Sequence, residues 1–206
     1  MKRVICLHVT FGLAVWALLC AALAPVNAQT IGSTYSSAAP NDCRIIGKPG
    51  ELDGSATRVC PGKSGLIVLV NEDDLRETVS VGRSRAAAAR EPAAQAWFGP
   101  FNASTATIEW RALDGKPFAI IQRWHLDDNG DEDKNGRPIA KPMLVVTRLP
   151  PGPVCHVAYI DVKANPDANE LARKAADEFA RGFTCGKDAV KVIGDSGRAV
   201  ELAVRR

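Results

Sequence analysis

The stretch that decides the fold is TATIEWRALDGKPFAIIQRWHL, residues 105–126. Apolar and polar side chains alternate along it on both sides of Asp114-Gly115. Alternation with a period of two is typical of a β-strand that buries one face. An Asp-Gly pair between two such runs is typical of a tight hairpin turn. The sequence therefore predicts a β-hairpin over these residues.

The pleat of the strands favours one register for this hairpin. A three-residue loop with Gly115 in the left-handed conformation places Trp110 opposite Phe118 and Ile108 opposite Ile120. The apolar side chains of both strands then share one face, whereas a two-residue loop would separate the aromatic rings. We interpret the other face as the solvent-exposed side of a one-sided sheet, with an anionic partner as the alternative. That face carries Thr107, Glu109, Arg111, Arg123 and His125.

The remaining pattern predicts an α+β fold. Further strands are expected at 65–70, 77–82, 143–149, 154–162 and 197–204. Apolar residues at spacings of three and four predict one main helix over 166–182. We expect 29–42 to be a flexible N-terminal arm and 43–206 to be a single domain. In that domain an antiparallel sheet of five to seven strands has the helix packed on its apolar face, and a small β-sandwich is the alternative.

Residues 1–28 have the features of a cleaved signal peptide: a positive start, an apolar run and a small-residue cleavage site ending at Ala28. We prefer this interpretation to a retained membrane anchor because Pro25 breaks the apolar run. Loss of Lys2 and Arg3 lowers the formal net charge of +3 by two. A nearly neutral mature chain gives no electrostatic argument for nucleic acid or a membrane surface as partner. We expect a periplasmic or secreted protein.

Four cysteines remain in the mature chain, and an even number in an exported protein predicts disulfide bonds. They form two couples that are local in sequence, so we expect the disulfides Cys43–Cys60 and Cys155–Cys185. The sequence has no C-x-x-C motif, which argues against redox or metal-binding cysteines.

An acidic loop, residues 127–136, partly matches a calcium-binding loop. Asp131, Asp133 and Asn135 occupy the first, third and fifth positions, where alternate oxygen-bearing side chains converge on one cation. The twelfth position holds Pro142 instead of a bidentate glutamate, which excludes a complete EF-hand. The loop is therefore either a solvated turn between two strands or a partial calcium site.

Catalytic motifs are absent from the sequence. It contains no G-x-S-x-G, S-x-x-K or H-E-x-x-H pattern. The two histidines of the mature chain, His125 and His156, are expected to be structural. We expect no cofactor and a binding, accessory or inhibitor-like role toward a protein or small molecule. The alternatives are a calcium-stabilised module and a hydrolase whose active-site residues are scattered along the chain.

Overall fold

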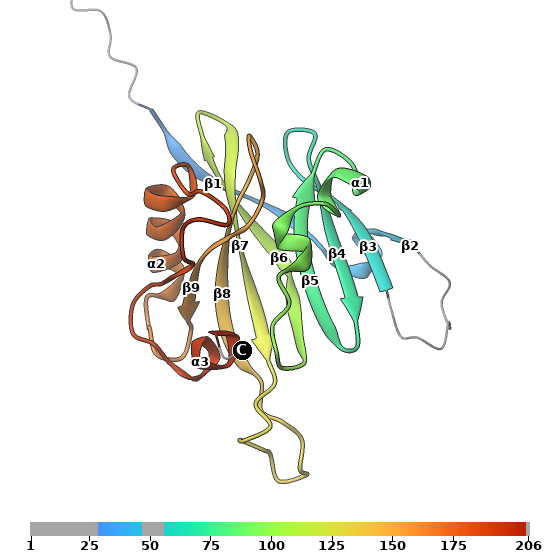
Figure 1. Ribbon diagram of the computed structural model, residues 1–206, viewed down its shortest axis with the longest axis vertical. Helices are drawn as coiled ribbons and strands as arrows, with labels where there is room; N and C mark the ends of the chain where they lie inside the picture. Colours follow the sequence, from blue (N-terminus) through green and yellow to red (C-terminus); the bar gives the residue numbers. More distant parts are fainter. Residues whose placement is uncertain (1–28, 47–55, 205–206) are drawn as a thin grey trace, which may run out of the picture.

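Two β-sheets make up most of the computed structural model, which describes residues 29–46 and 56–204 (Figure 1). The larger sheet has the order β1-β6-β7-β8-β9-β10. Its strands are β1 (Ile31–Ser37), β6 (Asn102–Leu113), β7 (Lys116–Leu126), β8 (Lys141–Arg148), β9 (His156–Asp161) and β10 (Lys191–Val192). The smaller sheet consists of β2 (Arg44–Ile46), β3 (Ala56–Pro61), β4 (Ile67–Asp73) and β5 (Arg76–Gly82), in that order. Neighbouring strands are antiparallel except for β9 and β10.

Helices are few and short. The main one is α2 (Ala168–Ala175), which continues as one π-helical turn, η3 (Ala176–Ala180), so the helix expected over 166–182 is present. The other helical segments are η1 (Pro40–Asp42), α1 (Arg85–Ala88), η2 (Pro92–Gln95) and α3 (Arg198–Val204). None of the helices in the described ranges is long and apolar enough to cross a membrane. The expected signal peptide, residues 1–28, lies outside the described residues.

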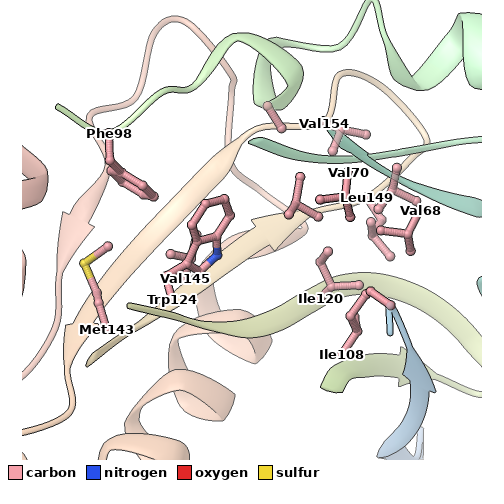
Figure 2. Packing of buried hydrophobic residues seen from close by; sticks show 14 of the residues in the cluster. Val68, Val70, Phe98, Ile108, Ile120, Trp124, Met143, Val145, Leu149 and Val154 are labelled. Atoms are coloured by element: carbon pink, nitrogen blue, oxygen red, sulfur yellow. The ribbon is translucent and has the colours of Figure 1, made fainter. Parts of the chain in front are cut away.

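One hydrophobic core joins the two sheets (Figure 2). Val68 and Val70 of β4 face Ile108 of β6, Ile120 of β7 and Val145 of β8, all nearly inaccessible to solvent. The expectation of a mainly antiparallel sheet with few helices is confirmed in this coarse form. The expectation of a single sheet is wrong, because the strands of 44–82 pair among themselves and pack against the larger sheet.

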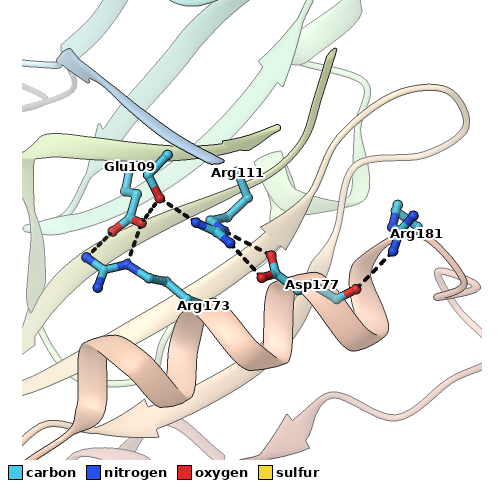
Figure 3. A network of polar contacts seen from close by, with 6 residues as sticks. Glu109, Arg111, Arg173, Asp177 and Arg181 are labelled. Carbon is cyan, nitrogen blue, oxygen red and sulfur yellow. Dashed lines mark hydrogen bonds and ion pairs between the residues drawn. The ribbon is translucent and has the colours of Figure 1, made fainter. Parts of the chain in front are cut away.

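The main helix packs on the opposite face of the larger sheet. A stripe of buried alanines on α2 and η3 contacts Ile121, Leu144 and Val146. The same face carries Glu109 and Arg111, which are buried by the helix. Our prediction that this face is solvent-exposed is therefore wrong for Glu109 and Arg111, since the helix supplies partners for both charges (Figure 3). On the same face Thr107 is exposed, and Arg123 and His125 are half-buried.

The hairpin exists, but the predicted register is wrong. Asp114 and Gly115 both have positive φ, at 49° and 76°, and form a two-residue turn. A bulge at Phe118 then shifts the pairing, so that Trp110 lies opposite Ile120. Phe118 consequently belongs to the core under α2 instead of the core shared by the two sheets.

Two further expectations about the chain ends are wrong. Residues 29–42 include β1, which pairs with β6 from Ile31–Leu113 to Ser37–Thr107 and is not a flexible arm. Its mostly polar sequence suits an edge strand. Residues 197–204 form α3 instead of a closing strand, because a carboxylate oxygen of Asp161 accepts a hydrogen bond from Ala199 N in the first turn.

Both predicted disulfides are present. Cys43 is bonded to Cys60 at the start of the smaller sheet, and Cys155 is bonded to Cys185 after the main helix. These bonds are compatible with an oxidising compartment.

Candidate functional site

A cavity of about 600 Å³ opens between four segments that are far apart in sequence. These segments are residues 92–99, β9, the loop 183–190 and the end of α3. The side chains that define its chemistry are Trp97, Phe98, His156, Tyr159, Phe183 and Asp188. This volume lies within the range of small-molecule sites in proteins, which are mainly apolar with a few polar groups. We call it the aromatic cavity.

Backbone contacts and a disulfide hold the walls of the aromatic cavity in place. Val154, just before β9, accepts a hydrogen bond from Ala93 N (2.9 Å) and donates one to the carboxylate of Glu91 (2.7 Å). These two bonds fix residues 92–99 against β9. On the other side the Cys155–Cys185 disulfide ties the loop 183–190 to β9.

The rings of Phe98, His156 and Tyr159 form the floor of the cavity, and Trp124 packs behind Phe98 in the core. The ring of Phe98 lies parallel to His156 (centroids 5.8 Å apart) and edge-on to Tyr159 (5.6 Å) and Trp124 (5.1 Å). Such offset and edge-on pairs are the favourable geometries of aromatic rings. At the rim, Trp97 is 42% exposed although tryptophan is usually well buried. The floor is therefore built of rings packed against one another, and the rim presents an apolar surface to solvent.

His156 is the polar group of this floor. Its Nδ1 lies 2.9 Å from the hydroxyl of Tyr159. Burial lowers the pKa of His156 to about 4, so the imidazole is neutral at pH 7. A neutral imidazole can donate and accept a hydrogen bond, which allows it to orient a ligand without supplying a charge.

We expect the free energy of unfolding to decrease as the pH falls from about 6.5 to about 4. His156 takes up its proton near pH 6.5 in the unfolded chain but only near pH 4 in the folded one, so the unfolded state binds more protons between these values. One such group contributes a slope of at most about 1.4 kcal/mol per pH unit. Urea unfolding at pH 7, 6 and 5 measures it. His156→Phe should flatten the dependence, and an unchanged slope in this variant would contradict the assignment.

The other histidine lies elsewhere. His125 is half-buried on β7 and does not line the aromatic cavity. Burial and the charge of Arg123 lower the pKa of His125. A histidine–carboxylate arrangement would favour the hydrolase alternative, and His156 and Asp188 do line the same cavity. The Asp188 carboxylate, however, accepts a hydrogen bond from Thr184 N, and His156 bonds with Tyr159.

The acidic loop pairs its carboxylates with cations. Asp131 forms an ion pair with Lys141, and Asp133 forms one with Arg137 at 2.9 Å. Backbone hydrogen bonds from Arg137 and Asn135 lower the pKa of Asp133. Within 29–46 and 56–204, no three histidine, cysteine, aspartate or glutamate side chains lie close enough to hold a metal ion. The calcium site remains a prediction, which thermal melting in EDTA with calcium, against magnesium, would test.

Apart from His156, which we expect to be structural, the sequence does not single out the side chains that define the aromatic cavity. Trp97 and Phe98 lie in a segment without regular alternation, and Phe183 follows directly after the helix predicted over 166–182. The sequence signal that could have indicated this cavity is the Trp97-Phe98 pair beside Gly99-Pro100. Large aromatic side chains in a turn-rich segment have few local neighbours to pack against, so they pack against distant parts of the chain or remain exposed. The chain matches no protein-family model, no curated protein and no solved structure.

Proposed function

We propose that this protein is an exported binding module, acting in the periplasm or outside the cell, whose aromatic cavity binds a small, uncharged aromatic molecule. The observation that carries the proposal is the combination of a 600 Å³ volume with a floor of stacked rings and an exposed tryptophan at the rim. Planar ligands bind to such surfaces by stacking and by burying apolar area. The neutral imidazole of His156 supplies one hydrogen bond.

Binding is favoured over hydrolysis by the positions of the polar groups in the cavity. His156 and Asp188 are each engaged with another residue of the chain. General-base catalysis requires the base within hydrogen-bond reach of a proton that it removes from substrate or nucleophile. The arrangement suits orientation of a ligand. The two disulfides support a location in an oxidising compartment.

Trp97→Ala should weaken binding of N-phenyl-1-naphthylamine, an uncharged fluorescent aromatic probe, by about tenfold. The indole is partly exposed and lines the cavity, so its loss removes contact area with little effect on the fold. Probe fluorescence titrated with mature protein gives the Kd. Phe101→Ala, which removes an aromatic ring of similar exposure (36% against 42%) outside this cavity, is the matched control. The proposal fails if the probe does not saturate one site, or if both variants bind it equally.

A further inference from the structure

A bulge in β6 opens a second cavity, of about 370 Å³, on the α2 side of the larger sheet. Ser104 pairs with Trp124 and Ile108 pairs with Gln122, so the segment 105–107 lies opposite the single residue Arg123. Bulges of this kind bend a strand and redirect its side chains, and they are frequent beside functional sites. This cavity shares no lining residue with the aromatic cavity.

The second cavity is lined mainly by hydrogen-bonding groups. The donors among them come from Tyr35, Thr105, Thr107, Arg123, Asn169 and Arg173, and the carboxylate of Glu109, which is paired with Arg173, also lines the cavity. The set combines three hydroxyls, one carboxamide and two guanidinium groups. Hydroxyls and guanidinium groups all donate hydrogen bonds, and guanidinium does so in a planar fork that matches a carboxylate or phosphate.

Charge balance distinguishes the two arginines. Arg173 is neutralised by Glu109, with Nε–Oε1 at 2.7 Å and Nη2–Oε2 at 3.2 Å (Figure 3). Burial raises the pKa of Glu109, but hydrogen bonds from Arg173 and Ser33 outweigh it and keep this carboxylate ionised. Arg111 is paired with Asp177 in the same network. Within the described ranges, the side chain of Arg123 makes no hydrogen bond or ion pair, although Arg123 is half-buried.

An unpaired cation in a half-buried cavity favours a negatively charged ligand. Partial burial removes part of the hydration of the Arg123 guanidinium, and no side chain of the described residues replaces it. Hydrogen bonds to a bound anion would compensate for the lost hydration. The donors around it can bind the remaining oxygens of the ligand. The charge of Arg123 also acts on His125, two residues away: burial and this charge together lower the pKa of His125.

We propose that this cavity binds a small oxyanion that carries hydroxyl groups, with Arg123 as its counter-charge. A single unpaired cation in a volume of 370 Å³ suits a small ligand with one carboxylate or phosphate group, of the size of a sugar acid or sugar phosphate, and not an extended polyanion. The hydroxyls of Thr105 and Thr107, presented by the bulge, bind the hydroxyl groups of the ligand. The site is independent of the aromatic ligand proposed above.

Titrations of the ¹⁵N-labelled mature chain, followed by NMR, test this proposal with two probes. Sodium gluconate offers a carboxylate and sodium glycerol phosphate offers a phosphate, and sodium chloride at equal ionic strength is the reference. We expect saturable shifts at the amides of Thr107 and Asn169 and at Arg123 Nε with at least one probe. Arg123→Gln should weaken this binding by about tenfold or more, as expected for hydrogen bonds to a charged group.

Arg90→Gln is the matched control because it removes the same charge from an exposed arginine whose side chain has no partner within the described ranges. It should leave the affinity unchanged. If Arg123→Gln does not fold, Thr107→Val should weaken binding severalfold instead. The proposal is overturned if neither probe saturates, if sodium chloride produces the same shifts, or if Arg123→Gln binds as tightly as Arg90→Gln. Binding of the uncharged naphthylamine probe should be unaffected by Arg123→Gln, which separates this test from that of the aromatic cavity.

Discussion

Asp161→Ala should lower the free energy of unfolding by about 3 kcal/mol, because one buried carboxylate satisfies three backbone N–H groups. Oδ1 accepts hydrogen bonds from Lys163 N and Ala164 N, and Oδ2 accepts one from Ala199 N, all at 2.9 Å. Asp161 is 1% exposed, so water cannot replace these bonds without local opening. For a chain of this size the loss corresponds to a fall in Tm of about 6–12 °C. Thermal and urea unfolding measure it.

Two further variants test whether the loss of stability is specific to the hydrogen bonds of Asp161. Asp167→Ala removes an exposed aspartate at the start of α2 whose side chain makes no capping hydrogen bond, and should change stability by less than about 0.5 kcal/mol. Gly197→Ala would place a Cβ 2.5 Å from Oδ2 of Asp161, so it should also destabilise. Combined with Asp161→Ala it should cost less than the sum of the two effects. A loss below about 1 kcal/mol in Asp161→Ala would show that the carboxylate does not anchor α3.

The parts of the fold that the sequence predicts are those encoded by neighbouring residues. Strands β4 to β9 follow apolar runs or alternation within a few residues, and the 166–182 helix follows its own periodicity. The two disulfides join cysteines 17 and 30 residues apart, close enough for local pairing to be the better choice. Each of these inferences needed only one stretch of chain.

The parts that the sequence does not predict depend on distant partners. The burial of Glu109 depends on Arg173, 64 residues away, and that of Arg111 on Asp177, 66 residues away. Without those partners the charges indicate a solvated face. Similarly, β1 has too few apolar residues to be recognised, and is held by pairing with β6. Local alternation cannot show which polar face another element will cover.

The two cavities follow the same rule. Four segments meet at the aromatic cavity, and only the folded chain brings Trp97 and Phe183 together. The second cavity depends on a bulge, which shifts one strand against the other and leaves no mark in the alternation of Arg123 with its neighbours. The alternation of the strands did predict that Arg123, Glu109 and Thr107 share one face. This is the only feature of the second cavity that a strand pattern can predict.

Trp110→Ala should be more damaging than Asp161→Ala, with a loss of about 4 kcal/mol in the free energy of unfolding. Trp110 is completely buried in the core between the two sheets, and its Nε1 donates a hydrogen bond to Ser36 Oγ of β1 at 2.8 Å. The truncation therefore leaves a large void and removes a side-chain hydrogen bond to β1, the strand at the edge of the larger sheet. Denaturation followed by far-ultraviolet circular dichroism measures the loss without relying on tryptophan fluorescence.

The same substitution at Trp97 separates packing from binding. Trp97→Ala should change stability by less than about 1 kcal/mol because its indole is 42% exposed, whereas Trp110→Ala removes an indole with no exposed surface. Trp110→Phe keeps part of the packing but loses the hydrogen bond to Ser36, and should cost about 2 kcal/mol. If the two alanine variants were equally stable, Trp110 would not hold the sheets together. If Trp97→Ala were the more damaging, its ring would belong to the core, and its effect on the naphthylamine probe would follow from misfolding instead of lost contact.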